Sequence, residues 1–411
     1  MAKITPFKAV RPSRDKVGLV ASRPFEEYSF EELRFQLEHN PYSFLHIINP
    51  GYKFQKEVSG ETRFQLVKNR YLEFKEEEVF IQDELPCYYI YKTKSRNHSY
   101  CGIIAAASVE DYEQNIIKKH EDTIALREKL FKEYLQVVGF NTEPVLLTYP
   151  DSEVINCIID ETMAQRPEYE FTSFNKDTHY LWKVDTPELT QKIKEEFEKM
   201  PCLYIADGHH RSASSWLLAR EAQAANAEHT GQESYNFFMS YLIAESNLKL
   251  FEFNRLVRDL NGLTKKEFLI QLDEWFRIEN RGSELYRPSK KHHFSMYLEG
   301  EFYSLYLRKT KYDFKDSLSA LDPYILYLKI LKPILGIEDL RNDLRIAYIP
   351  GKNESFEVKE AIDKGEFAVG FGMLPLSIEE LKQVAEEGLT MPPKSTYIEP
   401  KLRSGLTIYE F

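Results

Sequence analysis

Apolar runs of strand length alternate with helical patterns along almost the whole chain. Residues 145–148, 179–184 and 203–206 have the length and apolar character of buried strands, and an Ala-rich helical pattern covers about 212–227. Further strands are expected at residues 237–244, 294–298, 303–307 and 346–349. Such alternation predicts an α/β fold of the mixed α+β kind, and it leaves the strand order open.

The chain of 411 residues is long enough for two domains. We expect a first domain at residues 1–235 and an α+β subdomain at 236–411, which ends in a basic, mainly extended tail. Ser108-x-x-Asp111 is a capping pattern, and it predicts one long helix over residues 108–138 inserted in the first domain.

Charge and composition restrict the classes of partner. The formal net charge is −11, and an acidic chain does not offer the broad basic face that nucleic-acid backbones require. No run approaches the roughly 20 apolar residues of a membrane span, and the N-terminal residues do not resemble a signal peptide. Four widely spaced cysteines predict reduced thiols. We therefore expect a cytoplasmic protein without nucleic-acid or membrane partners.

The strand at residues 203–206 leads into the turn Asp207-Gly208-His209-His210-Arg211 and then into a helix. A turn of this kind exposes the free N–H groups and the positive dipole end of the helix, which form a natural site for phosphate. Arg211 could add a bidentate contact, and Gly208 lets the backbone approach a ligand closely. Asp207 could hold a magnesium ion or orient an imidazole.

Two other interpretations of this turn remain open. Asp207 could simply cap the helix, with both histidines as half-exposed turn residues. A transition-metal site is the weaker alternative, because adjacent histidines rarely bind one ion together and no third ligand lies nearby in the sequence. Ser212, the next residue of the turn, is a further candidate phosphate ligand.

Polar residues interrupt the apolar stripe of the expected helix at 108–138. His120 and Arg127 lie in the middle of that stripe and Thr123 lies at its edge, with Glu121 beside His120. Buried polar groups need partners, so these residues line either a functional cleft or a structural hydrogen-bond network.

The tail offers a second group of cations. Lys394, Ser395 and Thr396 are followed by Lys401 and Arg403, so cations alternate with hydroxyls in an otherwise acidic protein. This pattern is typical of a loop that holds a phosphate or carboxylate, and a solvated tail is the alternative.

Two isolated charged residues complete the candidates. Arg255, within Asn254-Arg255, is expected in a structural salt bridge rather than at a ligand. Glu26, in the turn Pro24-Phe25-Glu26, is either a surface cap or a general base. P-loop, dinucleotide-binding and hydrolase motifs are absent from the sequence.

Several segments together resemble a bacterial and archaeal family of domains of unknown function, number 1015. The resemblance covers essentially the whole chain. The segments are Asn40-Pro-Tyr-Ser-Phe-Leu-His46, Ile117-Lys-Lys-His-Glu-Asp-Thr123, Tyr204-Ile-Ala-Asp-Gly-His-His-Arg211, Asn254-Arg255 and Met391-Pro-Pro-Lys-Ser-Thr396. The family usually has Pro-Tyr-Asp where this chain has Pro24-Phe25-Glu26, so the acid is kept but is one methylene longer.

The turn from Gly208 to Arg211 also resembles the phosphate-binding turn of the ParB/sulfiredoxin superfamily, which includes free-serine kinases. This resemblance implies a ParB/sulfiredoxin-like core in residues 1–235, elaborated by large insertions. It also implies an Mg²⁺-dependent phosphoryl-transfer enzyme that acts between ATP or ADP and serine or phosphoserine, as a kinase or as a phosphatase. A non-catalytic nucleotide-binding regulator is the alternative, because the superfamily also contains nucleotide-dependent switches.

The same resemblance implies roles for the candidate residues. Glu26, Asp207, His209 and His210 would be catalytic, with Asp207 also at the metal. Gly208, His210, Arg211 and Ser212 would bind phosphate together with Lys394, Ser395 and Thr396. The residues expected to line the cleft are His120, Glu121, Thr123, Arg127, Arg255, Lys401 and Arg403.

Overall fold

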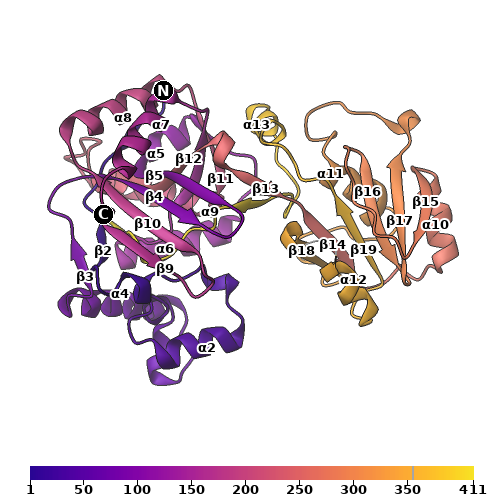
Figure 1. Cartoon of the computed structure of the whole chain (residues 1–411), viewed down its shortest axis with the longest axis horizontal. Helices are drawn as coiled ribbons and strands as arrows, with labels where there is room; N and C mark the ends of the chain where they lie inside the picture. Colours follow the sequence, from indigo (N-terminus) through magenta and orange to yellow (C-terminus); the bar gives the residue numbers. More distant parts are fainter. Residues whose placement is uncertain (354–355) are drawn as a thin grey trace. The chain divides into compact units, whose positions relative to one another are not determined.

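A computed structural model describes residues 1–353 and 356–411. The chain forms two compact units, each built from a β-sheet with helices packed on it (Figure 1). The first unit comprises residues 1–119, 123–248 and 400–411, and the second comprises residues 120–122 and 249–399. Strands and helices alternate in both units, and this confirms the expected mixed α/β class.

The first unit is organised around a nine-stranded sheet. Its strand order is β6-β11-β8-β12-β5-β4-β10-β9, with β1 paired to β5. The pairs β11–β6 and β12–β8 are parallel and the other pairs are antiparallel. The strands are β1 (Ile4–Thr5), β4 (Tyr88–Lys94), β5 (Ser99–Ser108), β6 (Ile117–Lys118), β8 (Val145–Tyr149), β9 (Tyr169–Thr172), β10 (Thr178–Val184), β11 (Leu203–Asp207) and β12 (Phe237–Ala244).

Helices bury the central strands of this sheet. Aliphatic side chains of α5 (Val109–Glu113), α7 (Glu153–Met163), α8 (Pro187–Lys199) and α9 (His209–Ala225) join those of the strands in one core. A second core lies around α4 (Gly60–Glu76), which packs on α6 (Ala125–Val138). The smaller elements are β2 (Val10–Pro12), α1 (Val17–Val20), η1 (Phe25–Glu27), α2 (Phe30–His39), α3 (Leu45–Ile48), η2 (Pro50–Phe54), β3 (Phe80–Gln82), β7 (Phe140–Asn141), η3 (Ser234–Asn236), η4 (Glu245–Asn247) and β21 (Tyr409–Glu410).

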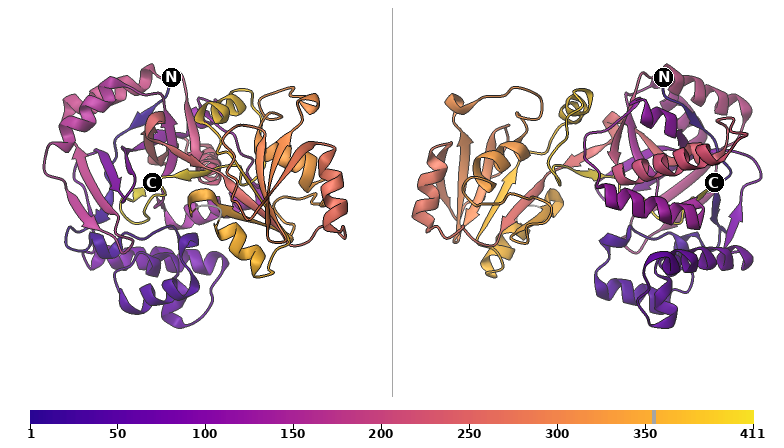
Figure 2. Two further views of the ribbon diagram at one scale, coloured as in Figure 1. Left: turned by 45° about the vertical axis from the view of Figure 1, so that its right-hand side comes forward. Right: turned by 180° about the vertical axis from the view of Figure 1, so that it is seen from behind.

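The second unit holds a six-stranded antiparallel sheet in the order β15-β17-β16-β19-β14-β18, drawn in orange and yellow in Figure 2. Its strands are β14 (Phe253–Val257), β15 (Phe276–Gly282), β16 (His293–Leu298), β17 (Glu301–Leu307), β18 (Ile346–Pro350) and β19 (Val369–Met373). A separate ladder joins β13 (Lys249–Phe251) to β20 (Tyr397–Glu399). The helices are α10 (Lys265–Asp273), η5 (Lys309–Lys311), α11 (Asp322–Leu326), η6 (Tyr327–Leu331), η7 (Gly351–Asn353), α12 (Phe356–Asp363) and α13 (Ile378–Glu386).

The units do not divide where the sequence analysis placed the domain boundary. Strand β12 lies between β8 and β5 in the first sheet, so the first unit continues to residue 248 instead of ending at 235. The last residues also return to the first unit, where Ile408 joins the core around α4 and β21 pairs with β7. These pairings join segments far apart in the sequence, which local patterns do not reveal.

The single helix expected at residues 108–138 is wrong. The chain forms the short helix α5, then β6, and only later the helix α6. Asn115 has a left-handed backbone, with φ of 57°, which ends α5, and β6 then pairs with the site strand β11. His120 therefore lies on no helix, and the stripe that included it does not exist.

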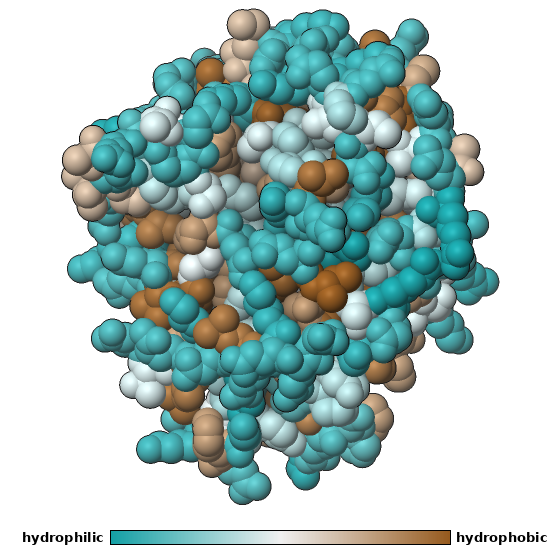
Figure 3. Space-filling view, turned by 90° about the vertical axis from the view of Figure 1, so that its left-hand side faces the viewer, coloured by the Kyte–Doolittle hydropathy of each residue, from teal (hydrophilic) through white to brown (hydrophobic). Residues whose placement is uncertain are grey.

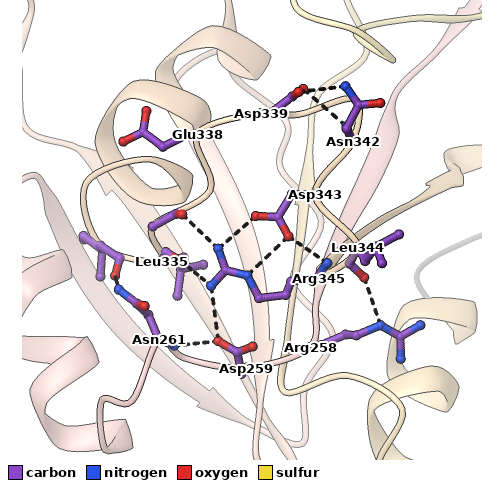
Figure 4. Close-up of polar contacts among 12 residues, drawn as sticks. Arg258, Asp259, Asn261, Leu335, Glu338, Asp339, Asn342, Asp343, Leu344 and Arg345 are labelled. Carbon is purple, nitrogen blue, oxygen red and sulfur yellow. Dashed lines mark hydrogen bonds and ion pairs between the residues drawn. The ribbon is translucent and has the colours of Figure 1, made fainter.

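A turn at residues 259–264 precedes helix α10, and Figure 4 shows the polar contacts around it. The backbone N–H of Asn261 donates to Asp259, and Arg345 bridges Asp343 and Asp259. The helix then starts with a capping box formed by Thr264 and Glu267. Side-chain oxygens thus accept from the backbone N–H groups of Asn261, Thr264 and Glu267.

The exposed surface is rich in polar groups. Hydrophilic side chains cover most of the face in Figure 3, and hydrophobic ones are scattered among them. Across the described part of the chain, no helix has both the length and the apolar character needed to cross a bilayer.

Strand β5 requires a glycine where Tyr241 crosses it. A Cβ on Gly102 would lie 2.4 Å from the carbonyl oxygen of Leu242 and 2.8 Å from Cζ of Tyr241, whose hydroxyl donates to Tyr91 O. We expect Gly102→Ala to lower the free energy of unfolding by about 1–3 kcal/mol, because the backbone or the ring must move. Urea denaturation measures this change.

The matched control is Gly18→Ala in α1, where the new Cβ would lie 3.6 Å from Phe171, an ordinary contact. Alanine is also the better helix former, so this variant should be as stable as the wild type or slightly more stable. Equal stabilities for both variants would contradict the packing described around Tyr241.

Candidate functional site

The turn between β11 and α9 brings Asp207 to the end of a buried strand and Gly208 to the start of a helix. The pairing of β11 with β8 shifts register between Ile205 and Asp207, so the ladder is irregular at the last residues of the strand. Gly208 caps α9 with φ of 104°, a conformation that other residues rarely adopt. The helix begins at His209, three residues before the start expected from the sequence.

The carboxylate of Asp207 is shared by two cations. Arg211 Nη2 lies 2.6 Å from Asp207 Oδ2, and Lys401 Nζ lies 2.9 Å from Oδ1. Burial opposes ionisation of this carboxyl, but Lys401 and Arg211 outweigh it and lower its pKa to about 2. Asp207 is therefore ionised at neutral pH, and one carboxylate faces two positive groups.

Arg211 connects this ion pair to a third segment. Its Nη1 donates to the carbonyl of Pro144 at 2.6 Å and lies 3.9 Å from Glu143 Oε2. Glu143 in turn accepts a hydrogen bond of 2.9 Å from the hydroxyl of Ser404. The tail, the turn and the loop before β8 thus meet at one place in the first unit.

The N-terminal segment joins the same place through Ser404. Backbone hydrogen bonds of 3.1 and 2.9 Å connect Ser22 and Ser404 in both directions, and Arg403 Nη1 lies 3.4 Å from the carbonyl of Ala21. Glu26 follows four residues later on η1, where its side chain is exposed. The first unit therefore brings together the predicted site residues Asp207, Gly208, Arg211, Lys401 and Arg403, with Glu26 on the adjoining segment.

The two histidines of the turn differ in environment. His209 is buried, and burial lowers its pKa to about 4; His210, Arg211 and Lys119 contribute to the lowering while Asp207 opposes it. His210 is half-buried, with its ring centroid 6.5 Å from that of Phe131 on α6. Ser212 is buried and donates its hydroxyl proton to Gly208 O, so its side chain serves the helix itself.

A second group of predicted residues gathers in the second unit. Met391 N donates to His120 O at 2.9 Å, and Thr390 donates to Asp122 at 3.1 Å, so the segment 120–122 is held by the residues that precede Lys394. Arg255 Nη2 donates to the carbonyl of Lys394 at 3.0 Å. Three of the segments that resemble the family are thus assembled within this unit.

Arg255 is the unexpected member of that group. Its side chain is 2% exposed, yet it makes no ion pair with any described residue, so the expected salt bridge is absent. The carbonyls of Phe253 and Lys394 accept its protons instead, and burial lowers its pKa to about 10. Arg255 thereby fixes the turn at Lys394, where φ is 56°, and Ser395 closes that turn by donating to Pro392 O at 2.7 Å.

For the remaining predicted residues, Glu121, Thr123, Arg127 and Thr396, the structure gives positions but does not test a ligand site. Thr123 donates to Glu128 at the start of α6, and Arg127 is exposed on that helix. Glu121 is exposed, and Thr396 is half-buried just before β20. Their place in a ligand site stays a prediction.

Sequence reasoning missed Glu143, Ser22 and Ser404. Each is a common polar residue in a segment without a motif, and each reaches the site through partners more than 200 residues away or through backbone pairing. The sequence held one clue. Ser404 and Gly405 are followed by the apolar residues Leu406, Ile408 and Tyr409, which a solvated tail would not contain.

Titration of His209 should make stability depend on pH. Its pKa is about 4 in the folded protein and about 6.5 when unfolded, so its stabilising contribution is complete above pH 6.5 and is lost as pH falls toward 4. Between pH 6.5 and 4 the titration of His209 should lower the free energy of unfolding of the wild type by at most about 3 kcal/mol. His209→Gln should not show this decrease. Urea denaturation at pH 4 to 7 measures it.

The control is His39→Gln on the exposed end of α2, which replaces a histidine outside the site. If the free energy of unfolding of His209→Gln changed with pH as that of the wild type does, His209 would not titrate as its burial implies.

Solved structures share only a weak overall likeness with this chain. A mutant of a free serine kinase in complex with AMP is 12% identical, with a TM-score of 0.37, and the match covers 74% of this chain and 91% of that one. A conserved hypothetical protein from Pyrococcus furiosus is 12% identical, with a TM-score of 0.36 and coverage of 73% and 91%. SbnI with a C-terminal truncation from Staphylococcus aureus is 13% identical, with a TM-score of 0.38 and coverage of 74% and 85%.

Sequence families give a firmer result. No curated protein matches the sequence. The family described as "Protein of unknown function (DUF1015)" matches residues 4–324, which contain the strands and helices of the first sheet together with the turn at Asp207. The chain therefore belongs to this family.

Proposed function

We propose that the protein is a phosphoryl-transfer enzyme that binds ATP or ADP at the turn between β11 and α9. The observation that carries the proposal is the start of α9: a glycine with φ of 104° opens a helix of 17 residues beside Arg211 and Lys401. The first N–H groups of a helix and its positive dipole end favour a phosphate, and two cations add charge.

Gly208 keeps the approach to these N–H groups open. A Cβ at this position would lie 3.1 Å from Arg211 Nε and 3.2 Å from its Cζ, besides being strained at this φ. A larger residue would therefore push Arg211 away from Asp207, and a phosphate would lose both the backbone and the guanidinium.

The ion pairs around Asp207 supply a mechanism for binding. The two cations face the carboxylate of Asp207 and, at 3.9 Å from Arg211, that of Glu143, so a phosphate binds by replacing carboxylates as the partners of these cations. A phosphate that takes over Arg211 and Lys401 releases Asp207, whose carboxylate is then available to Mg²⁺ carried by the nucleotide. Among the described residues no cluster of three His, Cys, Asp or Glu side chains could hold a metal, so phosphate oxygens would complete the coordination.

The histidines take different roles in this proposal. A histidine whose pKa is about 4 is neutral near pH 7, so buried His209 supplies a hydrogen bond or packing but no charge. His210, which is only half-buried, is the better candidate to contact the transferring group. Positioning and charge neutralisation account for most of phosphoryl-transfer catalysis, so few groups are needed.

Glu26 is the proposed base for the hydroxyl that receives the phosphate. Its segment is anchored beside the turn by the pairing of Ser22 with Ser404, and its carboxylate is exposed to an incoming substrate. Serine or phosphoserine as the second substrate follows from the resemblance of the turn to those of free-serine kinases. Transfer in either direction, or hydrolysis of phosphoserine, uses the same groups.

Removing either cation should weaken nucleotide binding. A charge-assisted hydrogen bond contributes about 1.5–3 kcal/mol, so Arg211→Gln and Lys401→Gln should each raise the Kd for ADP about 10- to 150-fold. Calorimetric titration measures the Kd, and ADP at about 100 times its Kd should stabilise the wild type by about 2.7 kcal/mol. The matched control is Arg166→Gln, which removes an exposed arginine outside the turn and the tail.

Glu26→Gln separates catalysis from binding. We expect it to abolish formation of phosphoserine from serine and nucleotide, measured by phosphorus NMR, while the Kd for ADP stays within about twofold of the wild type. Nucleotide binding without turnover in the wild type would favour the alternative of a non-catalytic regulator. Unchanged binding in Arg211→Gln and Lys401→Gln would exclude the turn as the phosphate site.

A further inference from the structure

The ring of His179 occupies an unusual place in the first unit. His179, on β10, is 2% exposed and lies between two aromatic rings, with its ring centroid 4.9 Å from that of Phe171 and 6.1 Å from that of Tyr91. Its Nδ1 faces the hydroxyls of Tyr91 at 2.8 Å and Thr93 at 3.4 Å. Its Nε2 is buried and finds no hydrogen-bond partner among residues 1–353 and 356–411.

The partners of Nδ1 bear on the tautomer. We infer the form in which the hydroxyl of Tyr91 donates to Nδ1, which places the ring proton on Nε2. Burial and the positive charge of Arg403 lower the pKa of His179 to about 3, so the ring stays neutral. The result is a buried N–H donor without an acceptor among the described residues, a rare feature that needs an explanation, and a bound partner is one.

Arg403 contributes positive charge to the surroundings of this donor. Its Nη1 lies 3.4 Å from the carbonyl of Ala21, which follows helix α1, and that helix contacts β9, the strand that carries Phe171, the ring stacked on His179. Arg403 also acts electrostatically on Tyr91, the hydrogen-bond partner of His179. No carboxylate of the described residues forms an ion pair with this guanidinium.

We propose that Arg403 and the Nε2–H of His179 form a subsite for the carboxylate of a small acceptor substrate. A guanidinium binds a carboxylate through two parallel hydrogen bonds, and the imidazole N–H adds a third donor. Because the imidazole is neutral, the subsite carries a single positive charge, which matches a carboxylate better than a phosphate dianion.

The chain itself connects this subsite to the phosphate turn. Lys401, two residues before Arg403, pairs with Asp207, and Ser404, one residue after it, pairs with Ser22 on the segment that leads to Glu26. A carboxylate at Arg403 would therefore be held by the same segment that connects the nucleotide turn with the proposed base. This inference depends on the proposed function only for the identity of the substrate, an α-amino acid with a hydroxyl.

The experiment follows the ring N–H of His179 by ¹H–¹⁵N NMR in the full-length protein. L-Serine, acetate, L-serinamide and inorganic phosphate are titrated separately, with and without ADP. We expect serine and acetate to shift this signal and serinamide, which lacks the carboxylate, to leave it unchanged. His179→Phe keeps the stacked ring but removes the donor, and Arg403→Gln removes the charge.

Both variants should bind serine at least tenfold more weakly than the wild type, and His179→Phe should keep its Kd for ADP within twofold. Arg166→Gln should behave as the wild type, and thermal unfolding verifies that each variant is folded. If neither serine nor acetate shifts the signal, or if both variants bind serine as the wild type does, the subsite is wrong. A response to phosphate alone overturns its assignment to a carboxylate.

Failure of the proposed function gives a different result. In that case ADP would not bind or no phosphoserine would form, while serine or acetate would still shift the His179 signal.

Discussion

The carboxylate of Asp207, held between Arg211 and Lys401, is the interaction on which the candidate site depends. Arg211 belongs to the helix that starts at this turn, whereas Lys401 comes from a segment 194 residues further along the chain. Because both cations use the same carboxylate, the turn and the tail are fixed to each other. The segment from Lys401 to Ser404 then fixes Ser22, and through it the segment that carries Glu26.

The same arrangement would allow an acidic protein to hold an anion at this turn. The net charge of −11 is an average over the whole chain, whereas the turn places Arg211 and Lys401 next to a helix start, where the carboxylates of Asp207 and Glu143 hold them. A strong but balanced ion pair keeps the cations in place without a ligand. Arg255 in the second unit differs from these two cations, because carbonyl oxygens rather than a carboxylate accept its protons. It shapes the turn at Lys394.

Local patterns predicted the elements well where burial alone determined them. The strands at residues 203–206 and 237–244 are apolar on both faces and lie inside a sheet, so their sequences reveal them directly. The expected helix at 108–138 failed because one left-handed residue, Asn115, breaks a pattern that otherwise has helical periodicity. The turn at Asp207 was recognisable because strand, glycine and helix follow each other within a few residues.

The assembly of the site could not be predicted in the same way. Nothing near Lys401 in the sequence indicates that it pairs with Asp207, and Glu143 and His179 lie in segments without a motif. Only tertiary contacts give them a role: the hydroxyl of Ser404 donates to Glu143, and the charge of Arg403 acts on His179. The return of the tail to the first unit decides these contacts, and that return depends on β21 and on the burial of Ile408.

The most direct measurement is a crystal structure of the protein with ADP and Mg²⁺. The account predicts phosphate oxygens within hydrogen-bond distance of the backbone N–H groups of residues 208–211, with Arg211 or Lys401 moved from Asp207 to the phosphate. ADP bound elsewhere, with both ion pairs of Asp207 intact, would contradict it.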